Sequence, residues 1–213
     1  MNIYRLLYFA LLLTCFLLYL LLPGKRKYEG TMVLLLLLLW LLTAGTAIYL
    51  VKVAGLQNNL FLFHLSTPLE YIILALLYRH AITNRPMRKM ISVSIPIFVL
   101  LSVLFGVFVQ PLRYNNSYIV IIESVLLVFL SLYFLREVLV LQPVLVLNRF
   151  PLFWISVAIL FYFTGNLVIE GMLNYMIRQS MELARRTYMI SYIFKYLLFC
   201  LFIAGALCNR RQT

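Results

Sequence analysis

Residues 59–79 read NLFLFHLSTPLEYIILALLYR, and this stretch decides the fold. It is long enough to cross the hydrocarbon core of a bilayer as a helix, which takes about 20 residues. Two ionisable residues, His64 and Glu70, nevertheless lie in its interior, ahead of Arg79 at its end. On a helical wheel the polar side chains gather on one arc and the large aliphatic side chains fill the other. The pattern predicts a membrane-spanning helix that turns a polar face toward the inside of a bundle.

The composition extends this prediction to the whole chain. The 213 residues are 65% hydrophobic and 11% charged, whereas soluble domains average about 25% charged residues. Seven apolar stretches of spanning length separate at polar, proline or glycine residues. They cover residues 3–22, 32–51, 60–78, 90–109, 118–135, 151–173 and 188–208. The connecting loops are short, so we predict an all-α membrane protein, a single seven-helix bundle over residues 1–213 with no extramembrane domain.

The distribution of basic residues predicts the orientation of the bundle. Lys and Arg favour the cytoplasmic loops of membrane proteins. With the N-terminus outside, eleven of the eighteen basic residues face the cytoplasm: Lys25, Arg26, Lys27, Arg79, Arg85, Arg88, Lys89, Arg136, Arg149, Arg210 and Arg211. Six lie on the outer side, and Lys195 falls inside a predicted span. We therefore predict an N-out, C-in protein of a bacterial inner membrane.

The loop after the third stretch is the most basic part of the chain. It carries Arg79, Arg85, Arg88 and Lys89, and such clusters attract the anionic head groups of cytoplasmic lipids. The remaining basic residues are spread over short loops without an aromatic-interleaved basic patch, which excludes nucleic acid as an expected partner. We predict that the bilayer itself, and its anionic lipids at this loop, are the main partners of the surface.

Residues 138–147 form a shorter apolar stretch, interrupted by Gln142 and Pro143. This stretch is too short to cross a bilayer as a helix. Two interpretations stay open from the sequence: a cytoplasmic overhang of the fifth helix, or a segment that lies in the membrane interface.

Ionisable residues inside spans are costly and normally face the bundle interior. The third, fifth, sixth and seventh stretches each carry a polar stripe with at least one such residue. The first, second and fourth carry none in mid-membrane, and we expect them to be packing or lipid-facing helices. The candidate residues for binding a ligand or protons are His64, Thr67, Glu70, Glu123, Asn166, Glu170, Tyr192 and Lys195.

Charge within these stripes does not balance. If the stripes converge, Lys195 is expected to pair with Glu70 or Glu123, which would offset part of the cost of desolvation. Three carboxyls would still face one lysine and one neutral histidine, so the interior is expected to hold a proton or to receive a cation. Two simpler interpretations stay open: Glu170 as an interfacial residue, and a Glu70–Lys195 ion pair that only fixes helix register.

Catalytic and metal-binding patterns are missing from the sequence. It contains no HExxH, no GxSxG and no phosphate-binding glycine loop, and all six acidic residues are glutamates. Cys15, Cys200 and Cys208 match no metal or redox spacing. His64 has no second histidine at helical spacing to share a metal ion. We therefore expect no enzyme activity, no bound metal and no cofactor.

Two segments resemble a known but essentially uncharacterised group of small seven-helix membrane proteins from Bacteroidota. These are the H-x-x-TPLE pattern in residues 64–70 and the PLFWISVAILFYFTGN sequence of residues 151–166. The group is often encoded near sensor histidine kinases, so the resemblance implies a bacterial inner membrane protein and a histidine kinase as a possible cytoplasmic partner. It supplies no ligand. The matching positions are His64, Thr67, Pro68, Glu70, Trp154, Gly165, Asn166 and Lys195.

These observations lead to three functional hypotheses. The first is a sensory or signalling protein with an outward-facing polar pocket for a small polar or cationic ligand or protons, read by a separate cytoplasmic partner. The second is a proton-coupled transporter of a small molecule or cation, although seven spans do not divide into two equal inverted repeats. The third is a structural membrane subunit. The sequence does not determine the oligomeric state.

Overall fold

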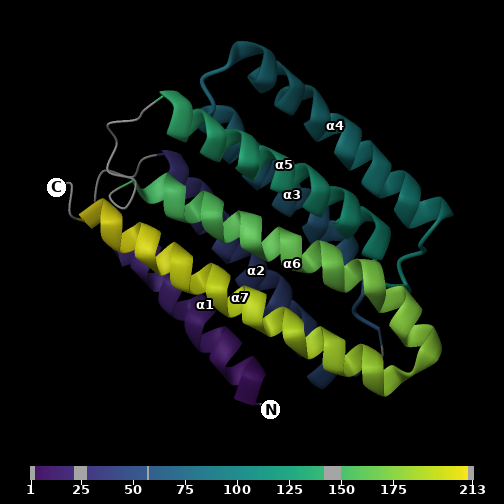
Figure 1. Cartoon of the computed structure of the whole chain (residues 1–213). Helices are drawn as coiled ribbons and strands as arrows, with labels where there is room; N and C mark the ends of the chain where they lie inside the picture. The colour runs from purple at the N-terminus through teal and green to yellow at the C-terminus, as the bar shows by residue number, and fades with distance from the viewer. Residues whose placement is uncertain (1–2, 22–27, 57, 142–149, 211–213) are drawn as a thin grey trace.

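The computed structural model describes residues 3–21, 28–56, 58–141 and 150–210. Within these residues it contains seven helices and no strand, and each helix is long and apolar enough to span a membrane. They are α1 (Ile3–Leu21), α2 (Tyr28–Lys52), α3 (Phe61–Ala81), α4 (Arg85–Phe108), α5 (Ser117–Leu141), α6 (Pro151–Gln179) and α7 (Met181–Arg210) (Figure 1). The predicted number and order of the apolar helices are confirmed.

Several helices are longer than the predicted spans, because polar residues at the ends continue the helical turns outside the apolar part. The α7 helix begins at Met181, ahead of the predicted start at residue 188. The α5 helix continues to Leu141, so residues 138–141 are a helical overhang of α5. The rest of that short stretch, residues 142–147, lies outside the described residues.

Six helices form a closed ring, and the seventh lies outside it. Going round the ring, α1 packs against α2, α2 against α3, α3 against α5, α5 against α6, α6 against α7, and α7 against α1. The α4 helix packs mainly on α3, with a smaller contact to α5, and Figure 1 shows it along the outer edge of the molecule. A residue at the centre of the bundle therefore comes from one of the six ring helices.

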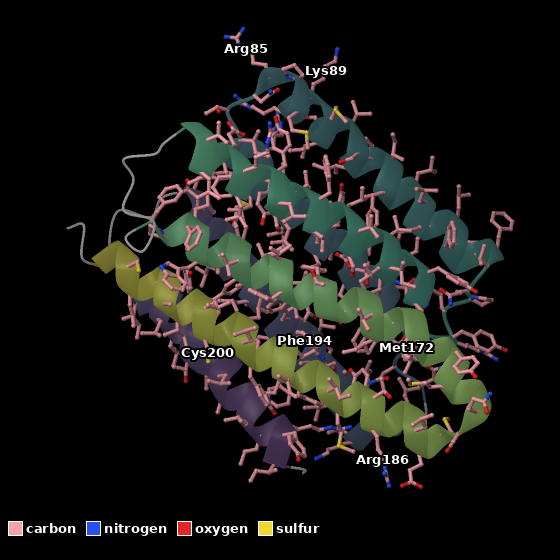
Figure 2. The ribbon with its side chains drawn as sticks, viewed as in Figure 1. Arg85, Lys89, Met172, Arg186, Phe194 and Cys200 are labelled. Atoms are coloured by element: carbon pink, nitrogen blue, oxygen red, sulfur yellow. The ribbon has the colours of Figure 1, made fainter. Side chains whose placement is uncertain are left out.

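Gly165 of α6 lies directly against the ring of Phe194 in α7. A Cβ atom placed on Gly165 would lie 2.5 Å from the Phe194 ring, well inside van der Waals contact. Phe194 is labelled in Figure 2, near the middle of α7. A residue larger than glycine at position 165 would push α6 and α7 apart, so this glycine allows the two helices to approach closely.

Basic side chains project from both ends of the bundle. Figure 2 shows Arg85 and Lys89 projecting away from the bundle at the start of α4, and Arg186 near the start of α7 at the other end. The basic residues at the end of α3 and the start of α4 are all exposed: Arg79, Arg85, Arg88 and Lys89. The start of α1 and the finish of α7 also lie at opposite ends in Figure 1. The exposed basic residues of the α3–α4 connection therefore gather at one end of the bundle.

Candidate functional site

Two hydrogen bonds fix how α3 and α5 lie against each other. Near one end, the Asn116 amide donates to the Thr67 hydroxyl at 3.5 Å. Further along, the Tyr78 and Ser131 hydroxyls share a hydrogen bond of 2.7 Å in a fully buried position. Both helices start at the same end of the bundle, so the two bonds hold them in a parallel register.

That register brings Glu70 and Glu123 to the same depth. Glu70 lies eight residues before Tyr78. Glu123 lies eight residues before Ser131, the hydrogen-bond partner of Tyr78. Eight residues correspond to about 12 Å of helix, so both carboxyls lie the same distance from the buried bond. They are close enough to interact electrostatically.

The two carboxyls are buried with unsatisfied oxygen atoms. Glu123 is 2% exposed, and its Oε1 has no hydrogen-bond partner within the described part of the chain. The Oε1 of Glu70 is also buried and without a partner among the described residues. A buried polar atom normally finds a partner, and each exception needs an explanation. Both oxygens are hydrogen-bond acceptors that the described residues do not satisfy.

Aromatic side chains from two further helices stand beside this carboxyl pair. The Trp40 indole of α2 lies beside the Glu70 carboxyl group. Tyr162 of α6 lies near both Glu70 and Glu123. The Trp40 and Tyr162 rings contact each other, with centroids 6.0 Å apart. The carboxyl pair therefore lies beside two aromatic rings that each carry one polar group, the Trp N–H and the Tyr O–H. This combination is typical of sites that hold a charged group in an apolar setting.

Lys195 of α7 lies in a cage of tyrosine rings. Its Nζ is 5.7 Å from the ring centroid of Tyr8, 5.3 Å from that of Tyr188 and 5.3 Å from that of Tyr192. These distances are within the range of cation–π attraction. We call Tyr8, Tyr188 and Tyr192 the tyrosine cage.

The expected ion pair of Lys195 with Glu70 or Glu123 is not formed. Within the described residues, the only pairs with a nitrogen–oxygen distance of 4.0 Å or less are His80–Glu29 and Arg186–Glu182, both near helix ends. Lys195 interacts with Glu70 only through space. The ring quadrupoles of the tyrosine cage stabilise the ammonium group in place of a carboxylate.

Each of the six ring helices contributes a side chain to this region. We call the set the interior cluster: Tyr8 from α1, Trp40 from α2, Glu70 from α3, Glu123 from α5, Tyr162 from α6 and Lys195 from α7. The fourth helix contributes none of these residues. The helices α1 and α2, expected to be packing or lipid-facing helices, each contribute one side chain to the interior cluster.

Glu170 lies in a second polar group, nearer the end of the bundle where α5 begins. Its Oε2 accepts a hydrogen bond from the Ser117 hydroxyl at 2.9 Å and another from the Asn115 amide at 3.2 Å. Lys195 is near enough to attract it through space. Glu170 thus ties α6 to the first turn of α5 through a partly buried side chain.

His64 and Thr67 hold the same end of α3. The Nε2 of His64 forms a hydrogen bond of 3.1 Å with the Tyr114 carbonyl, while its Nδ1 has no partner among the described residues. Thr67 donates to the Phe63 carbonyl and accepts from Asn116. These two residues connect α3 to the segment before α5, and within the described residues neither forms a hydrogen bond with the interior cluster.

Tyr192 and Asn166 are the remaining candidate residues from the sequence. Tyr192 is part of the tyrosine cage and so belongs with Lys195. Asn166 is partly buried on α6 and has no side-chain hydrogen bond within the described residues. The structure therefore brings together Glu70, Glu123, Tyr192 and Lys195 and places Glu170 at the neighbouring polar group. Within the described residues, Asn166 forms no hydrogen bond with either group.

Sequence reasoning missed the aromatic members of the site. Tyr8 belongs to a helical stripe with the buried Leu12 and Cys15, and Trp40 follows Leu36 and Leu37 on the buried face of α2. Spacings of three, four and seven residues on one face were a usable signal. That signal is weak by itself, because tyrosine and tryptophan in membrane helices are also common at the interfaces.

The described residues contain no group of three or more His, Cys, Asp or Glu side chains that could hold a metal ion. No protein-family model, curated protein or solved structure matches the chain. The chemistry of the site follows from its own side chains: two acceptor carboxyls, a caged ammonium group and the rings around them.

Proposed function

We propose that this protein is a membrane sensor in which the interior cluster binds a small cation or a proton, and a separate cytoplasmic partner reads the resulting helix rearrangement. One observation carries this proposal: Glu70 and Glu123 lie at one depth with unsatisfied oxygens, while the nearby cation Lys195 is held elsewhere, in the tyrosine cage.

The physical reason is the cost of placing negative charge in an apolar interior. A buried carboxylate without a partner is strongly disfavoured, and two of them repel each other at short range in a medium of low dielectric constant. A proton or one positive charge between Glu70 and Glu123 removes most of this cost. Occupancy of the site is therefore coupled to how closely α3 and α5 can pack.

The position of the cluster supports a signalling role. It joins six helices, so neutralising one charge changes the balance of contacts in all of them. A ligand shifts a conformational equilibrium by as much as its affinities for the two states differ, and a site shared by many helices offers large differences. The exposed basic residues Arg79, Arg85, Arg88 and Lys89 at one end of α3 and α4 are the natural contact for an acidic surface of a cytoplasmic partner, such as a histidine kinase.

A proton-coupled carrier is the second candidate. Glu170, Lys195 and Glu70 form a series of charged groups that leads from one end of the bundle toward its middle. From Glu70 and Glu123 to the basic end, however, the described parts of the six ring helices have no carboxyl, lysine, arginine or histidine until the last two turns at that end, where Glu29, Arg79 and Arg136 are the first. A transport path would need groups on both sides of the site, so this arrangement favours the sensor.

The experiment that tests the sensor uses the fluorescence of Trp40. The chain has two tryptophans, so Trp154→Phe leaves Trp40, next to Glu70, as the only one. We expect the Trp40 emission of the purified protein to change saturably with pH, and Glu70→Gln to abolish the change. Glu182→Gln is the matched control, because Glu182 is exposed and pairs with Arg186 far from the cluster.

Reconstituted liposomes separate the three functions. The sensor requires the Trp40 response without proton or cation flux across the liposome membrane. Flux that depends on Glu70 would establish the carrier instead. If Trp40 does not respond and no flux occurs, and deletion of the protein removes another protein from the membrane, the chain is a structural subunit.

A further inference from the structure

The unsatisfied atoms of the interior cluster specify what kind of cation fits. The Oε1 atoms of Glu70 and Glu123 are hydrogen-bond acceptors that lack a donor. A bare monovalent ion or a quaternary ammonium group supplies charge but no N–H. A primary ammonium group supplies charge and three donors in one small unit, so it can satisfy both carboxyls at the same time with charge-assisted hydrogen bonds.

The rings around the carboxyls suit the rest of such a ligand. The Trp40 and Tyr162 rings contact each other beside Glu70. Aromatic faces attract an ammonium group and also cover the apolar carbon chain attached to it. Acceptor oxygens next to ring faces are the two features that recognise an alkylammonium group.

Lys195 is an internal example of the same chemistry. Its side chain is itself a primary ammonium group on an alkyl stem, and the tyrosine cage holds it at 5.3–5.7 Å from three rings. The interior thus accommodates one alkylammonium group already. Because the cage keeps Lys195 out of contact with the carboxyls, the acceptor oxygens of Glu70 and Glu123 are left for a second one.

We propose that the interior cluster is a binding site for a small primary amine in its ammonium form, with Glu70 and Glu123 accepting its N–H groups and Trp40 and Tyr162 covering its alkyl part. This inference rests on the proposed function and names the ligand class. Lys195 acts as a neighbouring positive charge that weakens the binding and so sets its affinity.

The test uses methylammonium as the probe, with the purified full chain carrying Trp154→Phe. Methylammonium, tetramethylammonium and potassium chlorides are compared at equal ionic strength, by Trp40 emission and by the midpoint of thermal unfolding. We expect saturation with methylammonium at a concentration at least about tenfold lower than with the other two cations, because a hydrogen-bonding site rejects an analogue that lacks the N–H groups.

Variants assign the binding to the proposed groups. Glu70→Gln and Glu123→Gln should each raise the half-saturating methylammonium concentration by about tenfold or more, while Glu182→Gln leaves it unchanged. Lys195→Met should lower it, because the substitution removes a nearby positive charge. If a Glu variant fails to fold, the Lys195→Met result still decides: weaker binding in that variant would contradict the assignment.

The outcomes also separate this inference from the proposed function. Equal responses to methylammonium and tetramethylammonium would overturn the primary-amine assignment and leave a cation sensor. A pH response of Trp40 without any response to methylammonium would overturn the inference alone. The lack of both responses would overturn the inference and the proposed function together.

Discussion

Among single residues, Lys195 departs furthest from what its charge suggests. A lysine within a membrane helix is expected to find a carboxylate, and this one lies among the rings of Tyr8, Tyr188 and Tyr192. A desolvated ammonium group over aromatic rings gains about 2 kcal/mol or more. A helical wheel gives the face on which a residue lies but not the partner across the interface, so the stripe on α7 was predictable and the cage was not.

The tyrosine cage predicts different effects for an aromatic and an aliphatic residue at position 192. Tyr192→Phe keeps the ring and should retain most of the stability, whereas Tyr192→Leu should lower the midpoint of thermal unfolding, because a leucine has no quadrupole. A double-mutant cycle of Tyr192→Leu with Lys195→Met should give a coupling energy of about 1 kcal/mol. A coupling close to zero would show that the ring does not hold the ammonium group.

At the scale of elements, the polar stripes identified the carboxyls because charged residues in an apolar helix are costly and therefore informative. Glu70, Glu123 and Lys195 were found in this way. Gly165 gave no comparable signal as a contact residue, since a glycine in a helix has many possible reasons. Its role depends on Phe194 of α7, and sequence alone does not say which helix lies opposite.

The α6–α7 contact predicts a large effect from one methyl group. Gly165→Ala should destabilise the protein by about 1–3 kcal/mol through overpacking against the Phe194 ring. Gly171→Ala, on the same helix with nothing within 4 Å of the added atom, is the matched control and should be neutral or slightly stabilising. Unfolding midpoints of the two variants decide the matter. Equal midpoints for the two variants would mean that α6 and α7 do not touch at Gly165.

The register of α3 and α5 makes a second prediction at this scale. Tyr78→Phe removes the buried bond to Ser131 and should cost about 1 kcal/mol. Ser131→Ala should cost more, because it leaves the Tyr78 hydroxyl buried without this partner. If Tyr78→Phe proves the more damaging of the two changes in thermal unfolding, the hydroxyl has a different partner and the register argument fails.

For the whole molecule, length and composition were enough to predict the number of spans, because a bilayer sets the length of an apolar helix. They did not predict that six helices close into a ring and leave α4 outside. That arrangement depends on which faces fit together, and α4 has no ionisable residue in mid-span to place it inside. The same ring explains why α1 and α2 contribute Tyr8 and Trp40 to the site.

Orientation is testable at the scale of the molecule with the two residues that Figure 2 shows at opposite ends. After replacement of the three native cysteines by serine, Arg186→Cys and Lys89→Cys each provide one exposed thiol near the start of a helix. A membrane-impermeant thiol reagent on intact cells should label Arg186→Cys and not Lys89→Cys, and inverted vesicles should reverse the result. The opposite pattern would invert the predicted N-out, C-in topology.

The central claim is that Glu70 and Glu123 share one site for positive charge, and a double-mutant cycle tests it most directly. In amine-free buffer, the unfolding midpoint is measured for Glu70→Gln, Glu123→Gln and the double variant. Each single change relieves the repulsion between the two carboxyls, so both should stabilise the protein. The double variant should then gain clearly less than the two effects combined, with a coupling on the order of 1 kcal/mol. Strictly additive effects of the two substitutions would show that the carboxyls act independently and would contradict the claim.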